Sequence, residues 1–450
     1  MPQTRSRFSP PQILSFSIAG LIFVGGVLLW LPISSPAGPR VSFLDALFTS
    51  TSAVCVTGLV VVDTATQWSS PGQVVLMLLI QFGGLGYMTL STLLATALGR
   101  AVTLQERLAL QEALNAQGLE GLVKFAGTVL KLTLFFELTG AAILAVRWSG
   151  ELGVGKAAWY GLFHSVSAFN NAGFALWSDN LMQWRGDVTV NAVITVLIIC
   201  GGLGFLVLSE VMRQNRRVRL SLHTKLALSA TALLLIVGTV GILALEWHNT
   251  HTLGSLGLKD KLLAAWFQSV SPRTAGFNTV DIGAMTAPAL FLTMALMFIG
   301  ASPGSTGGGV KTTTFSVTVV ALWTTVRGGD EPELFGRRLS HETVARAFLV
   351  SLIAFLALNA TAGIVLVTEG RDLMKTLFET TSAFGTVGLS MGENGSAVSL
   401  SAFFSPLGKL LVMGMMFMGR VGPLTLAFAV ARRGTTQANI RYPEGKVLIG

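Results

Sequence analysis

The sequence contains four short segments whose backbone carbonyl groups could bind a cation. Each segment ends in a glycine followed by Leu or Phe, and the four read LFTSTSAVCVTGL, LFHSVSAFNNAGF, AWFQSVSPRTAGF and LFETTSAFGTVGL, with their glycines at Gly58, Gly173, Gly276 and Gly388. A glycine after two or three extended residues lets carbonyl oxygens point inward, where they can replace the hydration shell of an ion. One such glycine would indicate only a tight turn at a helix break, whereas four in register favour a cation-binding ring.

An apolar stretch precedes each glycine and predicts the element that positions it. An aromatic residue stands ten positions before each glycine, at Phe48, Phe163, Trp266 and Phe378. The stretch of about eleven apolar residues is too short to cross a ~30 Å hydrocarbon core and is typical of a re-entrant helix. We therefore expect four copies of a unit made of helix, short re-entrant pore helix, loop and helix.

The composition indicates that lipid surrounds these units. Of the 450 residues 51% are hydrophobic and 12% are charged, and the mean hydropathy is +0.65, whereas a soluble protein carries about a quarter charged residues. Apolar runs of roughly the spanning length occur at 13–31, 73–98, 125–146, 190–208, 226–245, 290–299 with its continuation, 347–367 and 410–430. The prediction is an all-α polytopic membrane protein with eight transmembrane helices plus four re-entrant pore helices, arranged as parallel repeats around a pseudo-fourfold central pore. The repeats are expected at 1–118, 119–222, 223–338 and 339–432, followed by a tail at 433–450.

The net charge of +9 is distributed as expected for membrane topology and does not indicate nucleic-acid binding. Lys and Arg gather in the loops near 100–124, 211–225 and 327–346 and in the tail, which predicts that these loops and both termini are cytoplasmic. The first apolar run lacks a small-residue cleavage site, so we expect it to be retained as a helix. The two cysteines, Cys55 and Cys200, lie in apolar segments and are expected to be free thiols.

A glycine-rich segment interrupts the second span of the third repeat. GASPGSTGGGVKT, at 300–312, cannot be a continuous helix, because glycine and proline disfavour helix interiors. It loosely matches the phosphate-binding pattern G-x-x-x-x-G-K-[ST], but Val310 separates the required glycine and lysine and no strand is expected before it. Both points argue against nucleotide binding.

The sequence resembles the Trk/Ktr/HKT superfamily of potassium transporters over nearly its whole length, and most of all the Ktr membrane subunits. Besides the four segments, the resemblance rests on GGLGY at 83–87, GGLGF at 201–205, RLSLHTKL at 219–226, the segment 300–312, FMGRVGP at 417–423 and the ending IRYPEGKVLIG. It implies potassium uptake through a selectivity filter formed by the four glycines with carbonyls of Val56, Thr57, Asn171, Ala172, Thr274, Ala275, Thr386 and Val387. In this family a serine at the first glycine position is associated with sodium transport, so Gly58 favours potassium.

The resemblance also makes the glycine-rich segment an intramembrane gate beneath the filter. The expected gate residues are Gly304, Ser305, Thr306, Gly307, Gly308, Gly309 and Lys311, together with Arg420. Arg420 is a lone cation in the apolar run 410–430; such a charge is costly in a membrane and usually faces a cavity, with snorkelling as the alternative. Arg273, His164 and Glu379 are expected to support the loops and pore helices without a catalytic role.

The resemblance further implies particular partners. Ktr-type membrane subunits form homodimers in the bacterial plasma membrane and bind a cytoplasmic ring of RCK-type, KtrA-like subunits that senses ATP or ADP, and some members are activated by sodium. No cofactor other than the potassium ion is expected on this chain. Two other functions are alternatives. An ion-coupled secondary carrier usually shows inverted repeats and paired acidic residues, but the repeats here are parallel and Glu137 stands nearly alone. A membrane enzyme needs clustered acid–base or metal-binding groups, but the five histidines are scattered.

Overall fold

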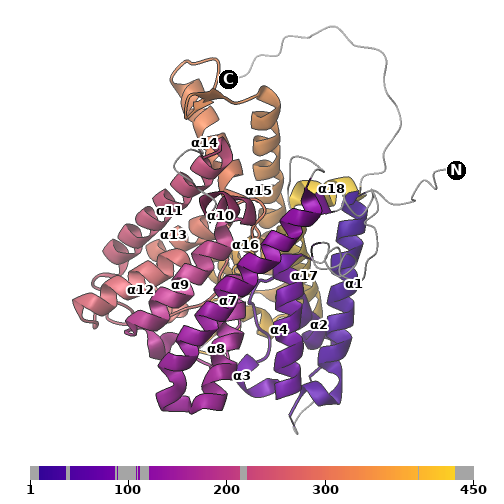
Figure 1. The fold of residues 1–450 in the computed structure, drawn as a ribbon, viewed down its shortest axis with the longest axis vertical. Coiled ribbons are helices and arrows are strands. Elements are labelled where there is room, and N and C mark those ends of the chain that lie inside the picture. Colours follow the sequence, from indigo (N-terminus) through magenta and orange to yellow (C-terminus); the bar gives the residue numbers. More distant parts are fainter. Residues whose placement is uncertain are drawn as a thin grey trace, which may run out of the picture.

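The computed structural model describes residues 10–36, 41–86, 89, 108, 110–111, 121–212, 220–393 and 395–430. The predicted tail 433–450 and most of the basic loop 100–124 lie outside these residues. Within the described part the chain is mostly helical and contains one two-stranded antiparallel hairpin. In Figure 1, α3 lies near one end of the molecule, and α10, α14 and α18 lie toward the other.

The described elements, in chain order, are α1 (Pro10–Trp30), η1 (Pro32–Ser34), α2 (Phe43–Val54), α3 (Thr64–Gln67), α4 (Ser70–Leu85), α7 (Leu122–Leu152), α8 (Val154–Phe169), η2 (Met182–Trp184), α9 (Val188–Leu203), α10 (Phe205–Met212), α11 (Leu222–Glu246), α12 (Leu258–Val270), η3 (Ile282–Ala284), α13 (Ala287–Phe298), α14 (Thr312–Val326), β1 (Glu333–Leu334), β2 (Arg337–Arg338), α15 (His341–Glu369), α16 (Leu373–Gly385), η4 (Leu400–Phe403), α17 (Pro406–Val421) and α18 (Pro423–Val430).

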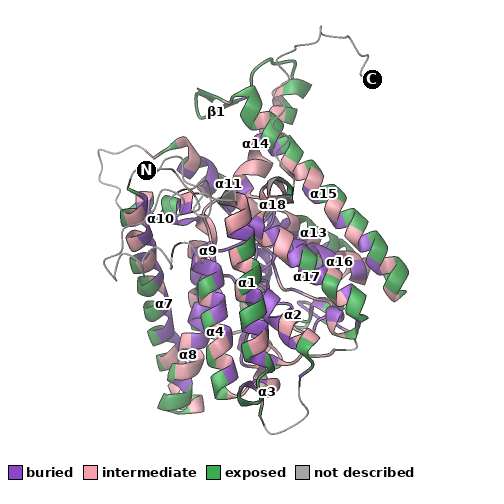
Figure 2. Cartoon of the chain, turned by 90° about the vertical axis from the view of Figure 1, so that its right-hand side faces the viewer, coloured by how far each residue is buried: buried purple, intermediate pink, exposed green. Residues whose placement is uncertain are grey.

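Four of these helices, α1, α7, α11 and α15, are long and apolar enough to cross a membrane. They expose large apolar side chains outward: Phe23 of α1 is 58% exposed, Phe135 of α7 is 55% and Phe355 of α15 is 56%. Figure 2 shows exposed residues running along α7 and α15, while buried residues gather between the helices. An outer surface of this kind fits hydrocarbon better than water, and the chain is a multi-pass membrane protein.

The second apolar run of the third repeat is interrupted between α13 and α14, as predicted, but the runs 190–208 and 410–430 are broken as well, so the prediction of a single helix over each of these two is wrong. Gly86, Gly204 and Gly422 end α4, α9 and α17 with φ of 80°, 95° and 94°, a conformation open to glycine because it lacks a Cβ. The axis of α10 is bent by 105° from that of α9. Counting this bent pair as one, the described residues hold up to five spans by length and composition, where the sequence predicted eight.

Of the four short helices α2, α8, α12 and α16, the first three are hydrogen-bonded to the long helices that precede them. In the first three, a serine hydroxyl donates to a carbonyl of the long helix: Ser50 to Ile22, Ser165 to Glu137 and Ser269 to Leu235. The long helices have glycines at the crossings, Gly25, Gly140 and Gly238, where an added Cβ would lie closer than 3.0 Å to the serine oxygen. The two backbones therefore pack closely at each of these crossings, which fixes the position of the short helix along the long one.

Candidate functional site: a ring of four glycines above a glycine-rich loop

The loops that follow the four short helices share an unusual backbone conformation. Two positions before the glycines, Val56, Asn171, Thr274 and Thr386 have φ of 49°, 57°, 82° and 49°. The expectation of extended residues at these positions is therefore wrong, because they are left-handed. A non-glycine residue at positive φ costs free energy and persists only where its surroundings impose it, which is common at functional sites.

The four glycines form a closed ring, called the glycine ring below. A Cβ built on each glycine would lie closer than 3.0 Å to a carbonyl oxygen of the next segment: Gly58 to Ala172, Gly173 to Ala275, Gly276 to Val387 and Gly388 to Thr57. These contacts follow the chain order and return to the start, so the four loops surround one axis. Carbonyl oxygens around such an axis can take the place of the water around a cation.

A serine at the end of each short helix holds the loop in place. The amides of Gly58 and Gly388 donate to Ser52 Oγ and Ser382 Oγ, both at 3.0 Å. In the other two loops the serine donates instead, Ser167 to the carbonyl of Phe174 and Ser271 to that of Phe277. The same residue type thus stabilises all four loops through either its acceptor or its donor.

The third loop is one residue shorter between this serine and its glycine, which corrects the sequence alignment. Ser271 stands five positions before Gly276, whereas the serines of the other loops stand six positions before theirs. Counting from the serine, the residue equivalent to the buried Phe48, Phe163 and Phe378 is Phe267, which is fully buried, and not Trp266, which is half-buried. The shorter loop also has the largest φ of the four left-handed residues, 82° at Thr274.

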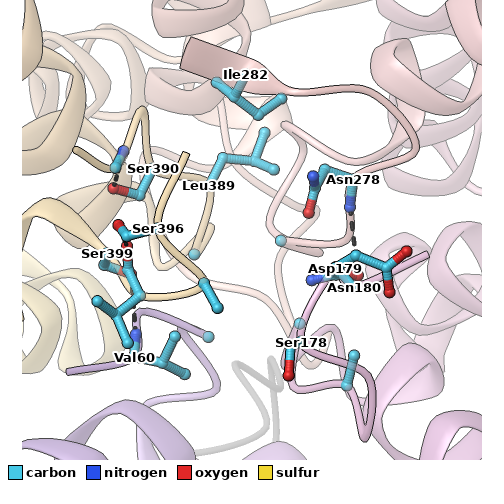
Figure 3. Close-up of a pocket in the computed structure, with 18 of the residues that line it drawn as sticks. Val60, Ser178, Asp179, Asn180, Asn278, Ile282, Leu389, Ser390, Ser396 and Ser399 are labelled. Carbon is cyan, nitrogen blue, oxygen red and sulfur yellow. Dashed lines mark hydrogen bonds between the residues drawn. The ribbon is translucent and has the colours of Figure 1, made fainter. Parts of the chain in front are cut away.

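A cavity of about 370 Å³ lies against one face of the glycine ring and is lined by all four glycines. We call it the ring-side cavity, and Figure 3 shows residues around it. Asp63, Asp179 and Asp281 line it, and Asp63 and Asp281 also cap α3 and η3. Carboxylates around a concave mouth attract cations and raise their local concentration.

The glycine-rich loop at 300–311, between α13 and α14, lies directly beside the residues that precede the glycines. The amide of Gly308 donates to Thr386 Oγ1 at 2.9 Å, and Thr306 Oγ1 donates to the carbonyl of Phe169 at 3.2 Å. The amide of Thr306 also donates to the carbonyl of Gly201 at 3.2 Å. The loop is therefore bonded to the second and fourth repeats while its ends belong to the third.

Two positively charged side chains that line a second cavity donate hydrogen bonds to this loop. Arg420, in the last turn of α17, donates to the carbonyls of Thr306, Gly83 and Gly84. The two glycines belong to the last turn of α4, where the helix dipole favours positive charge. Lys311 Nζ donates to the carbonyl of Gly307 at 2.6 Å. Both cations line a cavity of about 280 Å³, the loop-side cavity, together with Gly304 and Ser305.

The structure thus brings the four glycines into one ring with the carbonyls of the residues that directly precede them, Thr57, Ala172, Ala275 and Val387, and Thr306, Gly308 and Arg420 are hydrogen-bonded beside it. Arg273 is 7% exposed, and its guanidinium lies 3.4 Å from Thr231 Oγ1 of α11, behind the third loop. His164 and Glu379 are fully buried and hydrogen-bonded to the loops that follow their helices.

Sequence reasoning missed one buried polar cluster next to the ring. Glu137 of α7, 3% exposed, accepts hydrogen bonds from Asn170 Nδ2 at 2.8 Å and Gln81 Nε2 at 3.2 Å. Asn170 stands three positions before Gly173, so the cluster supports the second loop from behind. A lone acid in an apolar run was the signal that could have pointed to it.

Comparison with known proteins places the chain in a family. Residues 17–439 match the TrkH family, described as cation transport protein. The chain is 44% identical over 448 residues to the Ktr system potassium uptake protein B of Bacillus subtilis (strain 168), covering 99% of this chain and 97% of that protein. It is 42% identical to the protein of the same name from Vibrio alginolyticus, covering 99% of this chain and 96% of that protein. It is 39% identical to the potassium/sodium uptake protein NtpJ of Enterococcus hirae, covering 100% and 99%.

The fold is also that of a solved transporter. The crystal structure of the potassium transporter TrkH from Vibrio parahaemolyticus matches with a TM-score of 0.73 and 19% sequence identity, covering 96% of this chain and 87% of that one. The relatives are transport proteins, in keeping with a site built from backbone carbonyls. By the extent of the family match and the identity over its full length, the chain belongs to the TrkH family of cation transport proteins.

Proposed function

We propose that this chain takes up potassium ions across the plasma membrane as the membrane subunit of a Ktr-type system. The observation that carries the proposal is the closed order of contacts in the glycine ring, where each glycine lies against the carbonyl that precedes the next one. Residues Val56 to Gly58, Asn171 to Gly173, Thr274 to Gly276 and Thr386 to Gly388 form the selectivity filter. Relatives that share 44% and 42% of its residues are named potassium uptake proteins, which supports the choice of ion.

Potassium is favoured over sodium because all four ring positions are glycine. A side chain at any of them would meet a neighbouring carbonyl and change the size of the ring. The four loops nevertheless differ in residue type and in length, so we expect modest selectivity. The relative named potassium/sodium uptake protein is compatible with this expectation.

The glycine-rich loop acts as the gate. Gly304 to Gly309 lie across the path below the filter, held by Arg420 and Lys311, and the two cations repel a permeating ion while the loop is in place. Arg420 bonds carbonyls of both the loop and α4. Breaking these bonds would therefore free the loop and, at the same time, let the charged guanidinium move away from the path.

The remaining features of the proposed system are those that the similarity to Ktr-type membrane subunits implies. Each repeat crosses the membrane twice, once by a long helix and once by a broken one, so that both termini lie on the same side. The gathering of Lys and Arg in the loops and the tail makes that side the cytoplasm. The chain forms a homodimer and binds a KtrA-like RCK ring that carries the ATP or ADP site, and sodium acts as an activator. The basic cytoplasmic loops and the tail, Ile440–Gly450, are the contact surface for the RCK subunits.

Growth rescue of a potassium-uptake-deficient bacterium, with and without a ring subunit, tests the proposal. We expect rescue at low external potassium that is stronger when the ring is present. Liposomes separate this function from the alternative, a coupled carrier: uptake down a potassium gradient with no second ion gradient supports a pore. Uptake that requires an imposed sodium or proton gradient would support the carrier.

A further inference from the structure

A buried carboxylate stands behind the fourth filter loop and has no counterpart in the other three repeats. Glu379 follows Phe378 in α16 and is fully buried. The equivalent positions hold Thr49, His164 and Gln268. Thr49 bonds the backbone of its own helix, and Gln268 Nε2 has no hydrogen-bond partner among the described residues. The fourth repeat alone therefore places an acidic side chain at this point.

Glu379 accepts three hydrogen bonds from the segment outside the filter. Its Oε1 accepts from the amide of Ser401 at 2.8 Å and from the hydroxyl of Ser401 at 2.5 Å. Its Oε2 accepts from the hydroxyl of Ser390 at 2.6 Å, two residues after Gly388. The amide of Ser401 can only donate, so Oε1 of Glu379 must accept there, a role that a carboxyl oxygen can fill and an NH2 group cannot.

Ser390 and Ser399 extend this hydrogen-bond network from Glu379 to the first repeat. Ser390 Oγ, while donating to Glu379, accepts from the amides of Leu400 at 2.9 Å and Gly392 at 3.1 Å. Next to Leu400, Ser399 forms a reciprocal pair with Val60: its amide donates to the Val60 carbonyl at 2.8 Å, and its Oγ accepts from the Val60 amide at 2.9 Å. Figure 3 shows Ser399 and Val60 facing each other across the junction between the two loops.

A Cβ added to Gly388 would meet Thr57 and Gly58, and Val60 follows Gly58 by two residues, so on the side of the first repeat the pair is two residues away from this contact. We propose that Glu379 is a positioning residue for selectivity, which fixes the outer mouth of the filter by anchoring the fourth loop to the first through Ser390, Ser401 and Ser399. This inference rests on the proposed potassium function. It adds a residue outside the ring that determines which ion the ring prefers.

The substitution Glu379→Gln keeps the size of the side chain but replaces an acceptor by an NH2 donor. Facing Ser401, the NH2 would oppose an N–H; facing Ser390, it would meet an oxygen whose lone pairs already accept from two amides. Glu379→Asp keeps the charge and shortens the reach. Ser399→Ala removes only the acceptor for the Val60 amide, and it provides a milder test at the surface of the ring-side cavity.

Glu246 offers a matched control. It is also a buried carboxylate, 1% exposed, and accepts four hydrogen bonds, from the amide and hydroxyl of Thr286, from Asn249 and from Thr252. It lies at the end of α11 and does not line the ring-side cavity. Glu246→Gln should therefore lower thermal stability while leaving ion preference unchanged.

The experiment measures two quantities on purified full-length variants. The first is the ratio of sodium to potassium needed to inhibit uptake of labelled potassium into liposomes. The second is hydrogen–deuterium exchange of the peptide around Val60, which reports anchoring whether or not potassium is the transported ion. For Glu379→Gln and Glu379→Asp we expect the potassium preference to fall roughly tenfold, equivalent to about 1.4 kcal/mol, together with faster exchange at Val60. Ser399→Ala should change both readouts in the same direction, and combined with Glu379→Gln it should add little, since the two share one pathway.

The outcomes separate the two proposals. If the wild-type protein takes up no potassium, the proposed function fails. If it does, but both Glu379 variants keep the wild-type ion ratio or the wild-type exchange at Val60, the positioning role is overturned. A normal ratio in Glu379→Asp with an altered ratio in Glu379→Gln would also overturn it, because charge alone would then explain the effect.

Discussion

At the scale of single residues, the site depends on positions where a side chain is absent. Gly58 has φ of 92°, and a Cβ on it would lie 2.5 Å from the carbonyl oxygen of Ala172. Both its conformation and its surroundings therefore exclude other residues. The sequence identified this glycine and its three counterparts because four copies recur in register. It did not reveal the left-handed residue two positions earlier, since Val, Asn and Thr carry no common signal for that conformation.

Gly58→Ser should weaken the preference for potassium over sodium in uptake competition, because the added side chain changes the ring and displaces the carbonyl of Ala172. Gly336→Ser is the matched control: Gly336 also has positive φ, 71°, but nothing lies within 4 Å of an added Cβ. The control should keep the wild-type ratio. An unchanged ratio in a folded Gly58→Ser protein would remove Gly58 from the filter.

Arg420→Ala should raise potassium flux and make it less dependent on the cytoplasmic ring. A guanidinium about 6 Å from a potassium ion repels it by ~3 kcal/mol at an effective dielectric constant of about 20, and its bonds to Thr306 and α4 are lost as well. Arg420→Lys keeps the charge but not the fork of donors, so its flux should be intermediate. Flux into liposomes decides the matter, and unchanged flux in the alanine variant would make Arg420 a packing residue.

At the scale of elements, the long first helices and the short helices before the glycines could be predicted from apolar length. The break in the second span of the third repeat could be predicted from its glycines and proline, whereas the breaks that follow α4, α9 and α17 could not. GGLGY and GGLGF were visible as motifs, but a glycine within an apolar run does not by itself indicate a break, because such glycines also occur at helix crossings. In α4, Gly83 serves packing and Gly86 ends the helix, three residues apart. The contact of Gly83 with Val54 in the folded protein distinguishes the two roles, and the local sequence does not show that contact.

Gly83→Ala should destabilise the protein, because its Cβ would press on the carbonyl of Val54, at the end of α2. Overpacking of this kind costs about 1–3 kcal/mol. Gly127→Ala in α7 is the control, since nothing lies within 4 Å of its added Cβ; there alanine should be neutral or stabilising by up to ~1 kcal/mol. Thermal unfolding in detergent measures both, and equal melting temperatures would contradict the packing role of Gly83.

Deleting residues 305–308 should raise potassium flux while largely preserving ion preference, because it shortens the obstruction and leaves the glycine ring in place. It removes the bonds from Thr306 to Phe169 and from Gly308 to Thr386, so a small loss of preference is expected. In liposomes without RCK subunits, removing residues 335–336 from the β1–β2 turn, which lines neither the ring-side nor the loop-side cavity, should leave flux unchanged. Loss of flux in a normally inserted deletion protein would favour a structural hinge over a gate.

At the scale of the whole molecule, repetition made the site predictable and divergence between the repeats limited that prediction. Aligning on the glycines was correct, yet aligning on the aromatics shifted the third repeat by one position, to Trp266 instead of Phe267. A single sequence offers no independent register for a loop that has lost a residue. In the structure, the hydrogen bond from Ser271 to the carbonyl of Phe277 shows how the third loop aligns with the others.

Potassium should stabilise the folded protein, by an amount that rises with the logarithm of its concentration relative to the dissociation constant. A ligand at 100 times its dissociation constant adds about 2.7 kcal/mol to stability, so replacing potassium by sodium should lower the melting temperature of the wild type. The decrease should be smaller in Gly58→Ser, where the two ions are less well distinguished. An identical decrease in both proteins would argue that the stabilising site lies elsewhere.

The ring closes within one polypeptide, since Gly388 returns to Thr57 of the same chain. This has a genetic consequence. In pores assembled from separate subunits, a defective copy enters most complexes and inactivates them, so its alleles are dominant. Here each translated chain brings a complete set of loops, and a cell that carries a normal gene beside a Gly388 variant should lose uptake only in proportion to gene dosage, with the damaged allele behaving as recessive.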